Sequence, residues 1–279
     1  MGMVLRNWIG TAGIFACLII TSVAAHAQQN DRLEAFMSVT GFDVALESVK
    51  LSASSAPAMI GMGTDAFGSQ WTGMVDEVFD TEIMHDMAID ILSETLEDDL
   101  LDHAVAFYTS DLGARLVEVE NKSHMEEDDA LKTESGEAII SGLVRLGAPR
   151  LAELKRLNAA TGSIDASIHA IQEVQVRFLM AAAIAGVIEL PMDEADLREN
   201  LKRQEGELRR GLQTSALAGS AYTYQAFSDE EVSAYADALE NPKMQTVYAL
   251  MNAVQFEIMA NRYEALARRM QGLQPSQEL

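Results

Sequence analysis

Apolar residues recur with the spacing of an α-helix along most of the chain. In the stretch that begins at Leu96 they fall four, five, eight, nine and twelve positions later, on one face of a helix. A second seam runs from Ile164 to Ala185 and is interrupted by one polar position, Gln175. No stretch shows sustained strand-like alternation, and only 5 prolines interrupt the 279 residues. The sequence therefore predicts an all-α fold, an array of about nine to eleven helices.

Residues 1–27 have the layout of a secretory signal peptide. Arg6 is their one charged residue, an apolar run covers residues 14–20, and Ala25-His26-Ala27 provides the small side chains that signal peptidase requires. The apolar run is far shorter than the roughly 20 residues that cross a bilayer, which makes an uncleaved anchor the weaker alternative. We expect cleavage after Ala27 and export to the periplasm, so that the processed protein is not an integral membrane protein.

Cysteine content and charge exclude several function classes. Cys17 is the only cysteine and lies in the predicted signal peptide, so a processed chain has no disulfide, cysteine metal site or cysteine nucleophile. The chain has 43 Asp and Glu against 20 Lys and Arg, a net charge of −23, which repels nucleic acid and anionic lipid surfaces. We expect no nucleic-acid partner and interpret the acids as solvated helix faces.

Two stretches of the chain, 96–117 and 227–248, share a pattern of apolar positions when they are aligned. Ser110-Asp111 in the first stretch falls over Asn241-Pro242 in the second. Ser, Asp and Asn favour the cap of a following helix, and Pro suits its first position because it has no N–H to leave unpaired. The alignment predicts two related helix pairs that arose by internal duplication.

A break at residues 157–165 separates the two copies, with Gly162 placed to end one helix and Ser163 to cap the next. We predict an N-terminal helical half over 28–160 with the first copy, and a C-terminal helical half over 161–279 with the second copy.

The segment Phe107-Tyr108-Thr109-Ser110-Asp111-Leu112-Gly113 joins the two predicted helices of the first copy. With the acids and the apolar helix before it, this segment resembles the signature of the bacterial family named domain of unknown function 2059, in which an aromatic pair, a Ser-Pro and a Gly join two helices. Asp111 stands where the family usually has Pro, and the weaker second copy keeps Pro242 but lacks the aromatic pair and the Gly. The resemblance implies an exported, all-helical protein and supplies no catalytic residue. We interpret the segment as a hinge whose two rings pin the following helix.

Two groups of residues are weak candidates for binding a metal ion. Glu120, His124 and Asp128 are spaced four apart, so one helix running through them would present all three to a divalent ion. The second group offers thioether and imidazole ligands that suit copper(I), and it comprises Met84, His85 and Met87. Surface acids and core methionines explain both groups more simply, so we predict no metal and no cofactor.

Signatures of catalysis are missing from the sequence. It contains no HExxH, no glycine-rich phosphate loop and no GxSxG. Asp98, Asp99 and Asp102 near His103 could act as acid and base only if burial separated their pKa values, and the first turn of a helix already explains these acids. A non-enzymatic protein is therefore favoured, and a metal-binding protein or metal-assisted hydrolase that uses His and acidic residues is the alternative.

A stretch rich in Ser, Ala and Gly, residues 52–69, is the best candidate for a loop over a binding site. It contains Met59 and Met62, whose flexible side chains adapt to irregular apolar ligands. We predict a binding or interaction module that either packs on a protein partner or encloses an apolar small ligand. The residues predicted to contact that ligand are Met59, Met62 and Tyr108.

Overall fold

The computed structural model describes residues 28–53, 56–63 and 67–271, and the predicted signal peptide lies outside these ranges. The described residues contain helices and loops and no strand, which confirms the all-α class. Residues 28–40 are helical and precede α2. The twelve helices that follow in the described ranges slightly exceed the expected number, and one of them, α3, has four residues. They are α2 (Phe42–Ala53), α3 (Ala56–Met59), α4 (Ser69–Val78), α5 (Thr81–Thr95), α6 (Asp98–Tyr108), α7 (Asp111–His124), α8 (Asp129–Leu146), α9 (Arg150–Thr161), α10 (Ile164–Ile184), α11 (Glu194–Thr223), α12 (Asp229–Leu239) and α13 (Pro242–Arg269).

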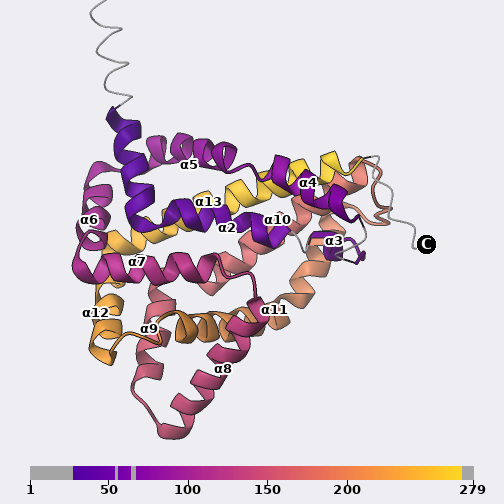
Figure 1. Cartoon of the computed structure of the whole chain (residues 1–279). Helices are drawn as coiled ribbons and strands as arrows, with labels where there is room; N and C mark the ends of the chain where they lie inside the picture. The colour runs from indigo at the N-terminus through magenta and orange to yellow at the C-terminus, as the bar shows by residue number, and fades with distance from the viewer. Residues whose placement is uncertain (1–27, 54–55, 64–66, 272–279) are drawn as a thin grey trace, which may run out of the picture.

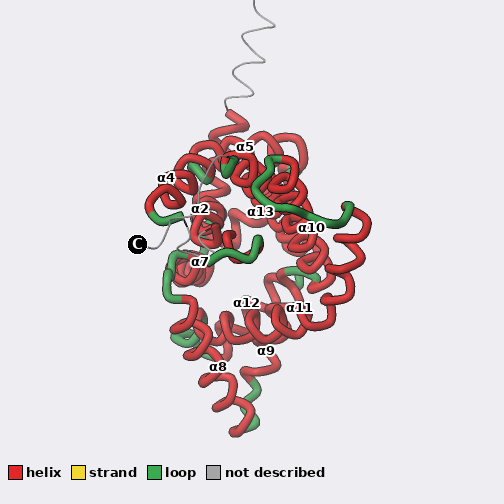
Figure 2. The backbone as a smooth tube through the Cα atoms, turned by 90° about the vertical axis from the view of Figure 1, so that its right-hand side faces the viewer, coloured by secondary structure: helices red, strands yellow, loops and turns green. Residues whose placement is uncertain are grey.

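The helices are arranged in an upper and a lower group, as Figures 1 and 2 show. The upper group contains α2, α4, α5, α10 and α13, and the lower group contains α9, α11 and α12. Helix α8 packs along α11, α12 packs on α9, and α10 packs on α13. The turn between α8 and α9 forms the pointed end of the molecule in Figure 1.

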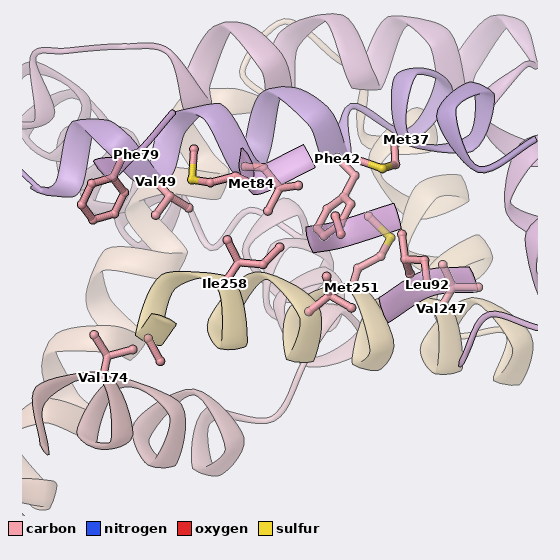
Figure 3. Close-up of a cluster of buried hydrophobic side chains, with 14 of the residues drawn as sticks. Met37, Phe42, Val49, Phe79, Met84, Leu92, Val174, Val247, Met251 and Ile258 are labelled. Atoms are coloured by element: carbon pink, nitrogen blue, oxygen red, sulfur yellow. The ribbon is translucent and has the colours of Figure 1, made fainter. Parts of the chain in front are cut away.

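Helix α13 is the centre of the hydrophobic core. From Met244 to Ile258 its buried positions follow each other at steps of three and four residues, and further buried positions continue this stripe to Ala267. Helix α13 contacts α2, α4, α5 and α6 from the N-terminal part of the chain and also α9, α10 and α12. Figure 3 shows Val247, Met251 and Ile258 of α13 opposite side chains from the N-terminal part of the chain, among them Phe42 and Met84.

The two predicted helix pairs are present at the predicted spacing. The first pair, α6 and α7, and the second pair, α12 and α13, begin at equivalent positions of the alignment. Ser110 caps α7 by accepting a hydrogen bond from Gly113 N, and Asn241 caps α13 by accepting from Lys243 N, with Pro242 as the first helical residue. Both predicted caps are therefore confirmed, and the break between each pair of helices has the expected cause.

Helices from the two predicted halves pack against each other throughout the structure. Helix α11 from the second half contacts α8 from the first, α12 contacts α9, and α13 contacts four N-terminal helices. Helix α9 ends at Thr161 and α10 begins at Ile164, so the predicted break is present, although the Ser163 side chain makes no capping hydrogen bond. The division at 160 and 161 is thus a division of the sequence, and whether each half is a domain stays a prediction.

Two expectations about local structure need correction or restriction. The apolar run at residues 178–188 is too short to cross a membrane and predicts a buried central helix. This prediction is wrong for the end of the run, because α10 ends at Ile184 and that side chain is 84 % exposed. The predicted loop 52–69 contains the end of α2 and the short helix α3, while residues 54–55 and 64–66 lie outside the described ranges. Among the described helices, none combines the length and the apolar character needed to cross a membrane.

Gly113 sets how closely α6 and α7 approach, which gives a first prediction. A Cβ atom at this position would lie 2.2 Å from Phe107 O and 2.7 Å from Tyr108 Cα, and both are backbone atoms that cannot move aside. We expect Gly113→Ala to lower the free energy of unfolding by about 1–3 kcal/mol, despite the better helix propensity of Ala.

The matched control is Gly142→Ala in α8, where the new Cβ meets nothing within 4 Å. This variant should be stabilised by roughly 0.5–1 kcal/mol, because Ala favours helix more than Gly does. Urea denaturation followed by circular dichroism measures both changes. Equal effects of the two substitutions would contradict the tight contact between α6 and α7.

A candidate ligand-binding cavity

A cavity of about 960 Å³ lies between the two groups of helices. Its wall is built by α2, α13 and the first turn of α10 from the upper group, by α9, α11 and α12 from the lower group, and by residues of α7 and α8. The volume falls in the range of sites that enclose small molecules. Many of its side chains carry amides or hydroxyls, including Asn121, Asn158, Asn252, Gln213, Gln255, Ser123, Ser220, Thr40 and Thr223.

Glu120 is the one acidic residue in the described wall of this cavity. Its Oε1 atom accepts a hydrogen bond of 2.7 Å from the Tyr224 hydroxyl and one of 2.8 Å from the Tyr235 hydroxyl. Among the described residues, no Lys, Arg or His forms an ion pair with Glu120, and its Oε2 atom has no hydrogen-bond partner. A carboxylate taken from water is normally paired with a cation, so this arrangement is unusual.

Two further tyrosines extend the hydrogen bonds away from the carboxylate. The Tyr248 hydroxyl lies 2.9 Å from that of Tyr235 and 2.5 Å from that of Tyr108. Each hydroxyl has a single proton, and Tyr235 uses its proton on Glu120. Tyr235 therefore accepts from Tyr248, and Tyr248 accepts from Tyr108. The phenolic protons are all directed toward Glu120, which makes this carboxyl group the final acceptor of the chain.

Glu120, Tyr108, Tyr224, Tyr235 and Tyr248 form the tyrosine cluster, and burial raises the pKa values of these residues. Removal from water raises the pKa of Glu120, and the hydroxyl donors of Tyr224 and Tyr235 oppose that shift only in part. Burial also raises the pKa values of Tyr108, Tyr224 and Tyr235 well above their ordinary value, and the Glu120 charge adds to the rise. The tyrosines therefore stay protonated and act as donors at physiological pH.

The cluster joins the two helix pairs that the sequence predicts to be related. Tyr108 ends α6 and Glu120 lies on α7, whereas Tyr235 lies on α12 and Tyr248 on α13. Phe107, the other ring of the hinge, stacks on Tyr235 with ring centroids 5.8 Å apart and an interplanar angle of 5°. The hinge segment of the first pair thus packs on the second pair, and the interpretation of its rings as a structural contact agrees with this geometry.

Arg150 holds Tyr224 in place. The side chain of Arg150 is 12 % exposed, and its guanidinium donates to the backbone oxygens of Tyr224 and Phe227 and to the carboxylate of Asp229. These acceptors form the turn between α11 and α12, so Arg150 of α9 fixes the turn from which Tyr224 reaches Glu120. Charge-assisted hydrogen bonds of this kind are stronger than neutral ones.

Gly41 and Asn121 form a close contact in the cavity wall. Gly41 has a φ of 72°, a conformation that favours glycine, and it connects the helical residues 28–40 to α2. A Cβ on Gly41 would lie 2.4 Å from Asn121 Oδ1. That oxygen is buried and has no hydrogen-bond partner among the described residues. Asn121 Oδ1 is therefore a second unpaired acceptor in the wall, on the residue that follows Glu120 in the sequence.

The residues predicted to contact a ligand lie in different places. Tyr108 is buried in the tyrosine cluster and is connected to the cavity wall through its hydrogen bond to Tyr248. Met59 and Met62 are half-buried and pack against the hydrophobic core, and neither belongs to the cavity wall. A ligand beneath residues 52–69 stays a prediction, and the described cavity lies elsewhere.

The metal candidates are also separated by the fold. Helix α7 ends at His124, and Asp128 caps α8 by accepting from Leu131 N, so the assumption of one helix through Glu120, His124 and Asp128 is wrong. Glu120 and His124 both line the cavity. Met84 is fully buried, Met87 packs on the core, and His85 is half-buried. No three or more His, Cys, Asp or Glu residues of the described ranges are grouped so that they could hold a metal ion.

Sequence reasoning missed Tyr224, Tyr235 and Tyr248 and interpreted Glu120 as one of many surface acids. A signal was present, because the chain has only 6 tyrosines and three of them belong to this cluster from the C-terminal half. Buried tyrosines need a partner for the hydroxyl, which would have directed attention to a buried acceptor. The sequence does not indicate which of 43 acids supplies that acceptor.

The fold and the site define an all-helical protein with a cavity between two helix groups, which is lined by polar and apolar side chains and whose carboxylate is held by tyrosines. Residues 82–141 match the family model described as an uncharacterized protein conserved in bacteria, DUF2059, which confirms the predicted resemblance. The matched segment extends from α5 into α8 and includes the hinge, and the second copy lies outside the matched range. No curated protein and no solved structure matches the chain.

Removing one hydroxyl from the cluster tests its energetics. Tyr235→Phe leaves Glu120 with one fewer donor and Tyr248 without its acceptor, so we expect the free energy of unfolding to fall by about 1–3 kcal/mol. Tyr222→Phe is the matched control, because the Tyr222 hydroxyl has no hydrogen bond among the described residues. Chemical denaturation of both variants should show a loss for the first and little change for the second. A loss of the same size in both would contradict the cluster.

The raised pKa of Glu120 predicts a pH-dependent stability. The folded protein holds this proton more tightly than the unfolded chain. The stabilisation is therefore complete below the unfolded pKa of about 4.3 and is lost as pH rises through the raised folded pKa. Glu120→Gln keeps an acceptor for both tyrosines and cannot ionise. We expect the free energy of unfolding of this variant, relative to that of the wild type, to increase as the pH rises from 4 to 8.

The comparison isolates Glu120 because the other groups that face it are the same in both proteins. These groups are the four tyrosines and, elsewhere in the cavity wall, His124, Lys132 and Lys155. Denaturation curves at several pH values give the difference directly. A difference that stays constant across the range would show that Glu120 does not titrate differently in the folded protein.

Proposed function

We propose that this protein is an exported, non-enzymatic binding protein that takes up a small polar molecule in the cavity between the two helix groups. The observation that carries the proposal is the cavity of about 960 Å³ with an unpaired carboxylate oxygen in a wall of amides and hydroxyls. Buried polar groups cost free energy unless they are hydrogen-bonded, and a ligand supplies the missing partners. The periplasm as its location rests on residues 1–27 of the sequence.

The chemistry of the wall argues for a polar ligand instead of the apolar one predicted from the methionines. Asn158, Asn252 and Gln255 offer donors and acceptors that can bind hydroxyls or amides of a ligand. Phe42 and Met251 add apolar area to the wall, which suits the carbon skeleton of such a molecule. A wall of this mixed kind is typical of sites that bind small metabolites.

A substitution that fills the cavity tests the proposal. Gly219 lies on α11 in the cavity wall, and a Cβ there meets nothing within 4 Å, so Gly219→Phe places a ring in the cavity. We expect native mass spectrometry of the protein purified gently from its host to show an added mass, and Gly219→Phe to abolish it.

Gly211→Phe is the matched control, because Gly211 is an exposed residue of the same helix outside the cavity wall and also has free space for a Cβ. This variant should keep the added mass. Circular dichroism shows whether both variants remain folded. A mass that persists in Gly219→Phe would refute binding in this cavity, and so would a wild type that carries no added mass and binds no added small polar molecule.

A further inference from the structure

The hydrogen bonds around Glu120 specify what a ligand has to bring to the cavity. Both tyrosine hydroxyls donate to the same oxygen, Oε1, and the protons of Tyr248 and Tyr108 are used further along the chain. The cluster therefore has no remaining donor for Oε2. A ligand that accepts hydrogen bonds gains nothing at this position, whereas a ligand that donates them completes the coordination of the carboxyl group.

The negative charge of Glu120 indicates which kind of hydrogen-bond donor a ligand should bring. Glu120 has no cationic partner among the described residues, although cations elsewhere on the surface are paired repeatedly, for example Arg156 with Asp237 and Glu240. A positively charged donor gains both a charge-assisted hydrogen bond and the attraction of an otherwise uncompensated charge. Tyr224, Tyr235 and Tyr248 line the cavity beside this carboxylate, and aromatic rings also favour cations.

The rest of the ligand should not carry further positive charge. Lys155 on α9 and Lys132 on α8 also belong to the cavity wall, and both are cationic. They disfavour a molecule with positive charges along its whole length. One positive group on a body that is polar or anionic satisfies both parts of the wall.

We infer that the ligand of this cavity carries a primary ammonium group that donates to Glu120 Oε2, on a body that is otherwise polar or anionic. The inference rests on the proposed function and names the class of molecule that the site takes. Glu120 is the ammonium-binding residue, and Tyr224 and Tyr235 are positioning residues that hold its carboxyl group. Amino sugars and the N-termini of short peptides both have this chemistry.

The test compares each amine with its N-acetylated form, which keeps the body and loses the positive charge. The probes are glucosamine with N-acetylglucosamine, and trialanine with N-acetyl-trialanine. Isothermal titration calorimetry and thermal shift with the wild-type protein need no variant. We expect at least one amine to bind, with its acetylated form at least about tenfold weaker because a charge-assisted hydrogen bond is lost. The pair that responds distinguishes an amino sugar from a peptide.

Glu120→Gln tests the same contact from the protein side. Its amide retains the acceptor for the tyrosines and removes the charge, so the amine should bind at least about tenfold more weakly. Glu118→Gln removes the same charge from an exposed position of the same helix outside the cavity wall and should change the affinity less than twofold.

Several outcomes would overturn the inference: equal binding of an amine and its acetylated form, equal effects of the two glutamine variants, or no binding of either amine. The added mass measured with Gly219→Phe separates these failures from failure of the proposed function. If that mass is present in the wild type and absent in the variant, the cavity binds a ligand of another class. If the wild type carries no added mass and binds no probe, both proposals fail.

Discussion

The buried stripe of α13 is the contact on which the rest of the structure depends. This helix has buried side chains along nearly its whole length, and it packs on helices from the beginning, the middle and the end of the chain. Removal of apolar side chains from water is the main favourable term in folding, and here one helix collects much of it. The N-terminal helices and helices α9, α10 and α12 therefore pack around α13 (Figure 2). Helix α13 also contributes side chains to the wall of the cavity.

The tyrosine cluster adds polar contacts between helices that this apolar packing brings together. Two helix pairs with a similar pattern of apolar residues meet with their hinge regions close together, and this contact buries Tyr108 and Tyr235 and leaves Glu120 half-buried. A group of polar atoms within a core is stable only when each atom has a partner, and here the phenolic protons form one chain that ends on a carboxyl group. The chain leaves one carboxylate oxygen without a protein partner at the cavity wall. Stability of the contact and capacity to bind a ligand therefore come from the same residue.

Local features were predictable because they depend on few neighbours. The helix class, the breaks before Asp111 and Pro242, and the caps Ser110 and Asn241 follow from spacing, from the missing N–H of proline and from side-chain hydrogen bonds over two or three residues. Glu120 could not be recognised in this way. It lies in a run of acids in which any member fits a solvated helix, and the end of α7 at His124 separates it from Asp128. Met59 and Met62 suited a flexible ligand site by residue type, but both pack against the core.

The sequence by itself determined the all-α class, the hinge between each pair of helices and the spacing of the two pairs, because helix periodicity, capping and proline act within a few residues. Only the tertiary structure decided that the pairs face each other, that tyrosines from α6, α11, α12 and α13 converge on Glu120, and that a cavity lies beside them. Those features depend on contacts between residues more than one hundred positions apart. The pattern of apolar residues indicates that a helix buries one face, but it does not indicate which other helix covers that face.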